Sequence, residues 1–351
     1  AIYADESIYE YPMQQGGGND GRPYSFGRPS SGGSKAAYPC KSYGQGRINP
    51  AYFYGVFDPN DMRRDVSITM TGSNGKGVEK LIPFVPNSKA EGGGLTLNKW
   101  DENRQANPWV AAQRKSGING PYMRMSEVYL GYAEVCAALG DVVTGKQYLK
   151  TVRERSFPQG LANTDAFIAS FGNDLVRAII EERGFEYAGE GDRRWTLIRS
   201  GYLPEDIKRI KDMTKAMMDG LATKGYYEFE NGNIISAYIW TKLVDAKTIY
   251  GHRLTAQCPT DKVNDPVLYP GWRGQKDNWE EMGLNYGSST PATNLAIKGL
   301  FEIVSEEEAA SLESQGYTKV NWGIDLVDNS DEYDKYLFWD YDYVSAPLYL
   351  W

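Results

Sequence analysis

The chain has 351 residues and a formal net charge of −8, and its 38 glycines and 26 tyrosines stand out in the composition. Phosphate binding requires a basic face, so this acidic balance argues against a nucleic-acid partner. The single histidine, His252, excludes most zinc sites and most Ser-His or Cys-His catalysis. No run of about 18 apolar residues occurs, so no helix is expected to span a membrane. The three cysteines are too few for a disulfide framework, although a Cys40–Cys258 bridge is possible if the chain is exported.

Residues 1–122 are rich in glycine, proline and turn signals. SIYEYPM at 7–13 predicts a strand, and the aperiodic stretch 14–50 that follows predicts a long loop of functional or mobile character. Further strands are predicted at DVSITMT (65–71) and GLTLNKW (94–100).

Residues 123–201 change to a helical pattern. The first helix buries Cys136 on its apolar face, and a Gly-Asp break at 140–141 opens a second helix, which together predict a tetratricopeptide-like hairpin. Asn163 and Asp174 are expected to cap two more helices, the second of which should end at Gly191. A further helical turn or two is predicted over 193–201.

Residues 202–351 alternate between helix, hairpin and loop. Pro204 begins an amphipathic helix, and Asn231-Gly232 predicts a β-hairpin with a type I′ turn. Ser305 and Glu308 form a capping box at the start of a short helix. We expect the three regions, 1–122, 123–201 and 202–351, to form one compact domain.

Three segments of the helical region resemble the SusD/RagB family, surface lipoproteins that pass nutrients to TonB-dependent transporters in Bacteroidetes. The segments are YMRMSEVYLGYAEVCAALGD (122–141), TVRERS (151–156) and AIIEERGFEYAGEGDRRWTLIRSG (178–201). The matching positions are Arg124, Glu127, Ala133, Glu134, Val152, Arg153, Arg155, Ile179, Glu182, Arg183, Glu186, Glu190, Gly191, Arg193, Leu197 and Arg199. Thr196 departs from the pattern, because the family usually has aspartate there.

The resemblance implies a mainly α fold of tetratricopeptide-type helix hairpins with long loops, short strands and hairpins. It implies a noncatalytic protein, lipid-anchored at the extracellular face of the outer membrane, that binds oligosaccharide or polysaccharide and delivers it to a SusC-like transporter. It implies no cofactor. Some family members are thought to take oligopeptides, so a peptide ligand is an alternative. A family member would also carry a lipidated cysteine, about one more helical half and a C-terminal tail, so we expect this sequence to be incomplete.

The charged residues of the matching segments have a structural interpretation. Glu182, Glu186 and Glu190 repeat every four residues and should lie on one helical face, where arginines of neighbouring helices can pair with them. The predicted network comprises Arg124, Glu127, Glu134, Arg153, Arg155, Glu182, Arg183, Glu186, Glu190, Arg193 and Arg199.

Aromatic residues in two polar loops are the candidate saccharide contacts. A flat ring meets the C–H face of a sugar while nearby amides and carboxylates meet its hydroxyls. The loops are 20–54, where the resemblance places part of the ligand face, and 269–286. The candidates are Tyr24, Tyr38, Tyr43, Tyr54, Trp272 and Trp279. The alternative for each is a role in loop packing.

Two further functions are open on the sequence. Two acidic groups could accept calcium, although both lack the spacing and glycine of a calcium loop, which favours solvated turns. They are Asp58, Asp61 and Asp65, and Asp325, Asp328, Asp331, Glu332 and Asp334. A glycan-cleaving enzyme needs only two carboxylates about 5–10 Å apart, and 46 acidic residues do not exclude such a pair.

Overall fold

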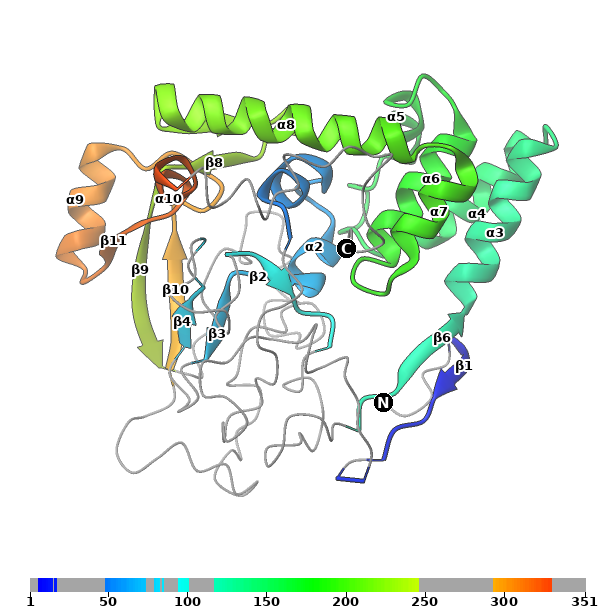
Figure 1. Ribbon diagram of the computed structural model, residues 1–351, viewed down its shortest axis with the longest axis horizontal. Helices are drawn as coiled ribbons and strands as arrows, with labels where there is room; N and C mark the ends of the chain where they lie inside the picture. The colour runs from blue at the N-terminus through cyan, green and yellow to red at the C-terminus, as the bar shows by residue number, and fades with distance from the viewer. Residues whose placement is uncertain are drawn as a thin grey trace.

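The computed structural model describes residues 6–14, 16–17, 48–73, 79–82, 84, 94–100, 117–245 and 293–329. The long helix α8 (Leu203–Lys224) runs along one edge and connects a helical side with a side that contains strands (Figure 1). Pro204 stands in its first turn, as predicted, and Gly225 ends it with a φ of 77°. The mainly α fold with helix hairpins and short strands is confirmed.

In the part of the chain that the structure describes, the helical side contains five helices: α3 (Met125–Ala138), α4 (Val142–Glu154), α5 (Thr164–Ala169), α6 (Leu175–Glu186) and α7 (Asp192–Ser200). Two predicted caps are confirmed, because the side-chain oxygen of Asn163 accepts from the backbone amide of Ala166 at 3.1 Å and the Asp174 carboxylate accepts from that of Arg177 at 2.9 Å. Cys136 is a free, buried cysteine, also as predicted.

The helix expected to continue to Gly191 is shorter than predicted. α6 ends at Glu186, and the chain then turns through Gly189, with a φ of 79°, before Gly191 begins α7. Both glycines adopt the left-handed region that other residues avoid. As a result Glu190 leaves the helical face that it was expected to share with Glu182 and Glu186.

The other side is built on a three-stranded antiparallel sheet in the order β10-β9-β11, with two short helices. The elements are β9 (Tyr238–Asp245), β10 (Thr293–Lys298), α9 (Glu306–Ser314), β11 (Thr318–Asn321) and α10 (Gly323–Asp328). The predicted cap of α9 is present, since the Ser305 hydroxyl accepts from the Glu308 amide at 3.2 Å.

The predicted hairpin forms from β7 (Tyr226–Glu228) and β8 (Ile234–Ser236), but its turn is different. Only Gly232 has a positive φ, 84°, whereas a type I′ turn needs two such residues. The Asn231 side chain instead donates to the carbonyl oxygens of Tyr54 at 2.8 Å and Phe57 at 2.7 Å. The role of the Asn231 side chain is therefore to hydrogen-bond the carbonyl groups at the end of a neighbouring helical turn.

The N-terminal part contributes further short elements. They are β1 (Ser7–Tyr11), the π-helical turn η2 (Tyr52–Val56), α2 (Met62–Ser67), β2 (Ile68–Thr69), β3 (Thr71–Ser73), β4 (Glu79–Leu81), β5 (Thr96–Leu97) and β6 (Gly120–Arg124). β1 pairs with β6, β2 with β5 and β3 with β4, all antiparallel. The strand predicted over 65–71 is wrong in its first half, because α2 continues to Ser67.

Two apolar cores lie under these elements. The larger one joins η2, the sheet, α8 and α10, with Trp322 and Tyr54 among its fully buried side chains. The smaller one lies between α3, α4 and α6. Among the described residues, none of the helices is long and apolar enough to cross a bilayer.

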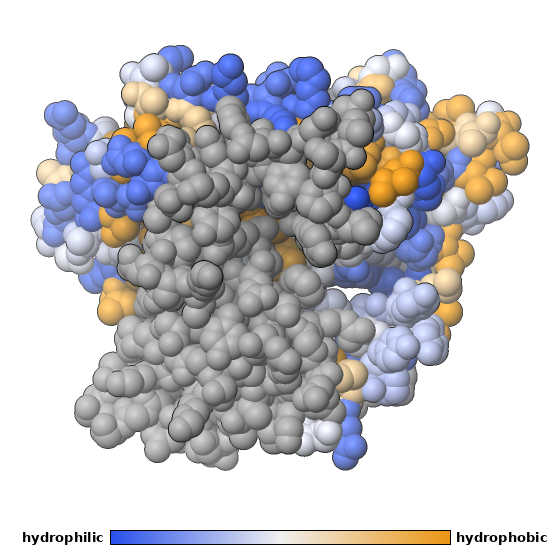
Figure 2. Space-filling view, viewed as in Figure 1, coloured by the Kyte–Doolittle hydropathy of each residue, from blue (hydrophilic) through white to orange (hydrophobic). Residues whose placement is uncertain are grey.

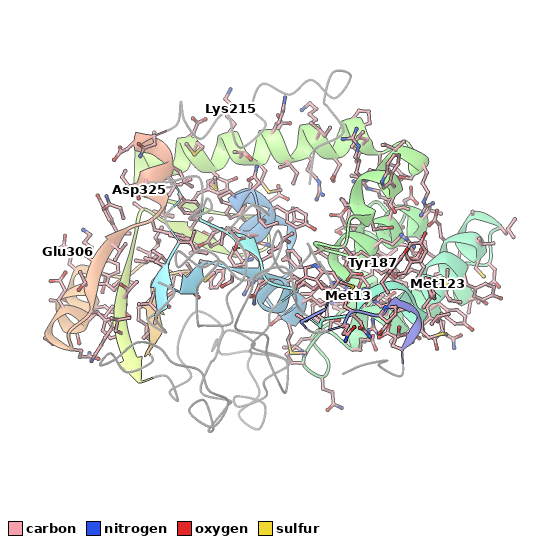
Figure 3. The ribbon with its side chains drawn as sticks, turned by 60° about the horizontal axis from the view of Figure 1, so that its bottom comes forward. Met13, Met123, Tyr187, Lys215, Glu306 and Asp325 are labelled. Carbon is pink, nitrogen blue, oxygen red and sulfur yellow. The ribbon has the colours of Figure 1, made fainter. Side chains whose placement is uncertain are left out.

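The surface along α8 differs from the surface over α3 and α4. Hydrophilic side chains follow α8, whereas hydrophobic ones gather over α3 and α4 (Figure 2). Lys215 projects from the outer side of α8, away from the body of the molecule (Figure 3). The exposed apolar residues of α3 and α4 are Val128, Tyr132, Val135, Val142 and Val143.

Candidate functional site

Helix α6 is surrounded by charged side chains from other elements. Glu182, which is 0% exposed, accepts from Arg63 of α2 at 2.6 Å and from Arg153 of α4 at 3.0 Å. Arg63 also binds Asp61 at 2.7 Å and Glu186 at 3.1 Å, so one guanidinium joins three carboxylates. We name the whole group the α6 cluster: Glu6, Asp61, Arg63, Lys99, Arg124, Arg153, Arg155, Glu182, Glu186 and Glu190.

Glu186 is the second centre of the α6 cluster. Its carboxylate accepts from Arg155 at 2.6 Å and from Arg124 at 3.0 Å, and its backbone carbonyl accepts from Lys99 at 2.7 Å. Arg124 and Lys99 also pair with Glu190, beyond the end of the helix. Residues from β6, α4 and the segment after β5 are thus fixed to one turn of α6.

The electrostatics of the cluster favour ionised carboxylates. Burial alone would raise the pKa of Glu186, but Arg63, Arg124 and Arg155 outweigh it and lower the pKa to about 2. A general acid must hold a proton at the working pH, and Glu186 does not hold one near neutrality. The group therefore orients helices and has no feature of a catalytic carboxyl pair.

A second cluster joins α6, α7 and α8. Glu181 is 2% exposed and binds Arg193 and Arg209, each at 2.8 Å. Asp206 accepts from the same two arginines, at 2.9 Å and 2.6 Å. Burial would raise the pKa of Glu181, but Arg193 and Arg209 lower it to about 2. We name Arg177, Glu181, Arg193, Asp206 and Arg209 the α8 cluster.

Two further pairs attach α3 to the rest of the bundle. Arg183 binds Glu127 and Asp192, both at 2.8 Å, and its Nε donates to the hydroxyl of Thr196 at 3.3 Å. Thr196 in turn donates to Asp192 at 2.8 Å. The threonine that departs from the family pattern therefore still takes part in the polar contacts of Arg183.

A last pair lies at the surface. Arg199 of α7 binds Glu134 of α3 through both terminal nitrogens, one of them at 2.7 Å. With this pair, the structure places every charged residue of the predicted network in an ion pair between segments. Sequence reasoning missed several partners: Glu6, Asp61, Arg63, Lys99, Glu181, Asp206 and Arg209. For Arg63, the sequence contained one indication of this role, since the residue follows Asp61 in a polar turn.

The prediction that Tyr54 contacts a ligand is wrong. Its side chain is 0% exposed, stacks on Phe229 with a ring separation of 6.1 Å, and accepts a hydrogen bond from Trp322 Nε1 at 3.0 Å. Burial raises its pKa well above the ordinary value. Tyr54 is part of the core because Trp322, at the start of α10, and Phe229, just after β7, pack against it.

The other predicted ligand residues lie outside the described part of the chain: Tyr24, Tyr38, Tyr43, Trp272 and Trp279. The same holds for Cys40 and Cys258, and for the acidic residues 331–334. Within the described ranges, no three acidic, histidine or cysteine side chains come together as a metal site would require. Asp61, one of the candidate calcium ligands, is occupied by Arg63 and by the cap of α2.

Comparison with known proteins gives one consistent family. The model of the SusD family matches residues 3–270, more than three quarters of the chain. A SusD-like protein of Formosa agariphila is 28% identical over 160 residues, which cover 45% of this chain and 26% of that protein. The surface glycan-binding protein A of Bacteroides thetaiotaomicron, solved in complex with laminarihexaose, is 19% identical with a TM-score of 0.41, over 58% of this chain and 44% of that one. A SusD superfamily protein of Bacteroides fragilis is 20% identical with a TM-score of 0.37, over 55% and 40%. The chain spans less than half the length of each of these relatives.

Proposed function

Because the chain belongs to the SusD family, we propose that it is a noncatalytic receptor that binds an oligosaccharide or polysaccharide and delivers it to a SusC-like TonB-dependent transporter. In this role it acts at the extracellular face of the outer membrane. The observation that supports this function best is the buried pairing of the family's charged residues. These residues build a rigid scaffold and leave recognition to side chains that project from it.

The α6 cluster does not supply the carboxyl pair of a glycan-cleaving enzyme. A glycosidase needs one protonated and one ionised carboxyl group on either side of the sugar. Glu182 is closed off from solvent and Glu186 is ionised through its arginine partners, so neither can meet a glycosidic oxygen as an acid.

Affinity gel electrophoresis across soluble plant, host and microbial polysaccharides tests the binding function. Retarded migration in at least one gel is expected, with no new reducing ends after prolonged incubation with the same polysaccharide. The appearance of reducing ends would establish cleavage instead. Retention of an oligopeptide mixture, with no retardation by any polysaccharide, would assign the chain to the peptide-binding alternative.

Delivery to a transporter has its own test. The protein and a SusC-like transporter from the same organism are co-expressed, and the transporter is purified from outer membranes through an affinity tag. Co-purification of the two chains in a fixed ratio is expected. Purification of the transporter alone would remove the delivery step and leave saccharide binding as the function.

A further inference from the structure

The ribbon formed by β1 and β6 carries three exposed tyrosines, one of which contacts the other two. Tyr9, Tyr11 and Tyr122 are 54%, 52% and 73% exposed. The ring of Tyr9 lies 5.7 Å from that of Tyr122 and 6.2 Å from that of Tyr11, both edge to face. Single aromatic residues at a surface are common, but a contiguous group of three is a feature of binding surfaces.

The ribbon is held in place by the scaffold. Glu6, just before β1, accepts from the Ser126 amide at 3.1 Å and from Arg155 at 2.8 Å, which connects it to the α6 cluster. On β1 itself, Glu10 accepts from the Asn119 side chain at 2.9 Å. Met123 of β6 and Met13, just after β1, mark the ribbon at the edge of the helical side (Figure 3). A fixed aromatic surface binds with little loss of conformational freedom.

We propose that Tyr9, Tyr11 and Tyr122, the tyrosine ribbon, form a saccharide-stacking subsite. This inference rests on the proposed function and names a place where the sugar binds. Tyrosine rings offer apolar surface to the C–H face of a pyranose, and their hydroxyls can exchange hydrogen bonds with its rim.

The size of the tyrosine ribbon favours a saccharide over a protein partner. Taking about 200 Å² for a whole tyrosine, exposures of 54%, 52% and 73% leave roughly 350 Å² of tyrosine surface open. A stable protein–protein interface buries about 800 Å² on each partner. The open area suits two or three sugar rings and is less than half of what a docked protein needs.

The test compares single-tyrosine variants that share the same scaffold. Tyr9→Ala removes the ring that touches the other two, Tyr122→Ala removes the most exposed ring, and Tyr9→Phe removes only a hydroxyl. Tyr132→Ala is the matched control, because Tyr132 is 50% exposed on α3, outside the ribbon. Binding is measured by calorimetry with laminarihexaose, cellohexaose and maltohexaose, and by affinity gels with the polysaccharides that retard the wild type.

We expect Tyr9→Ala to weaken binding of the retained saccharide about tenfold, and Tyr122→Ala by about fivefold. Tyr9→Phe and Tyr132→Ala should stay within about twofold of the wild type. All four variants should melt within a few degrees of it, since exposed side chains contribute little to stability.

The outcomes distinguish a failure of the tyrosine ribbon as a subsite from a failure of the proposed function. Wild-type binding that survives both alanine substitutions overturns the tyrosine ribbon as a subsite and leaves the proposed function intact. A wild type that binds no saccharide overturns the function together with the subsite. Peptide retention that disappears in Tyr9→Ala would show that the ribbon is a site for peptides and not for saccharides.

Discussion

Both sides of the molecule have an apolar core, but the helical side also depends on buried ion pairs. On the side of the sheet, η2, β9 and α10 enclose an aromatic core in which Tyr54, Phe53 and Trp322 are fully buried. On the helical side, α6 buries carboxylates that are neutralised by arginines of five other segments, namely α2, β6, α4, α7 and α8. Apolar packing is insensitive to pH and tolerates gradual changes of shape, whereas a buried ion pair fails abruptly when one partner is lost.

The largest effect is expected from removing a buried charge. Glu182→Ala should lower the free energy of unfolding by about 3 to 5 kcal/mol, because it leaves Arg63 and Arg153 without a shared carboxylate. Urea denaturation measures the change. Glu154→Ala is the control, since Glu154 lies on α4 with a 44% exposed side chain. Equal stability of the two variants would refute the structural role of Glu182.

Acid should weaken the helical side selectively. The pKa of Glu186 is lowered from 4.5 to about 2 in the folded protein. A lowered pKa gives stability that is complete above pH 4.5 and is lost as the pH falls towards 2, by about 3 kcal/mol for this group. The free energy of unfolding is measured between pH 6 and pH 3.

The control for this titration is Glu186→Gln, which has no carboxyl group to protonate. It should be less stable than the wild type at pH 6, and its stability should change less between pH 5 and pH 3. An identical slope in the two proteins would mean that Glu186 does not contribute to the acid sensitivity.

A smaller effect is expected in the aromatic core. Tyr54→Phe keeps the ring and removes the acceptor of the Trp322 Nε1–H group, so it should cost about 1 to 2 kcal/mol. Thermal and urea unfolding measure this loss of stability. Tyr9→Phe removes an exposed hydroxyl and should leave the melting temperature unchanged. Saccharide binding should persist in Tyr54→Phe, because this residue is buried.

The smallest effect distinguishes exposed from buried members of the charged network. Arg199→Ala breaks the pair with Glu134. The Arg199 side chain is 47% exposed, so the change should lower the free energy of unfolding by less than about 1 kcal/mol. Differential scanning calorimetry in low and high salt measures it. A loss as large as that of Glu182→Ala would show that position in the motif, and not burial, sets the contribution of each charge.

Local signals were the part of the fold that the sequence predicted well. The caps at Asn163, Asp174 and Ser305 depend on contacts within three residues, and all three are present. The pairing of Glu182 and Glu186 with arginines followed from their spacing on α6, although the sequence did not specify which arginine meets which carboxylate.

Long-range contacts were the part that the sequence did not predict. Tyr54 is buried because Trp322, which is 268 positions away, packs against it. Arg63 reaches Glu182 across 119 positions, and the tyrosine ribbon exists only because Tyr9 and Tyr122 are brought together by strand pairing. Periodicity and turn signals describe a few neighbouring residues and contain no information on such partners.

The hairpin turn between β7 and β8 has a consequence for the ageing of the protein. Asn231 precedes Gly232, the pair in which an asparagine most readily loses ammonia to form a cyclic imide, which water then opens to aspartate or isoaspartate. Its amide nitrogen donates to the carbonyl oxygens of Tyr54 and Phe57. Deamidation would replace that donor with a negative oxygen facing two carbonyl oxygens, so a spontaneous chemical change at a surface turn would loosen the π-helical turn beneath it.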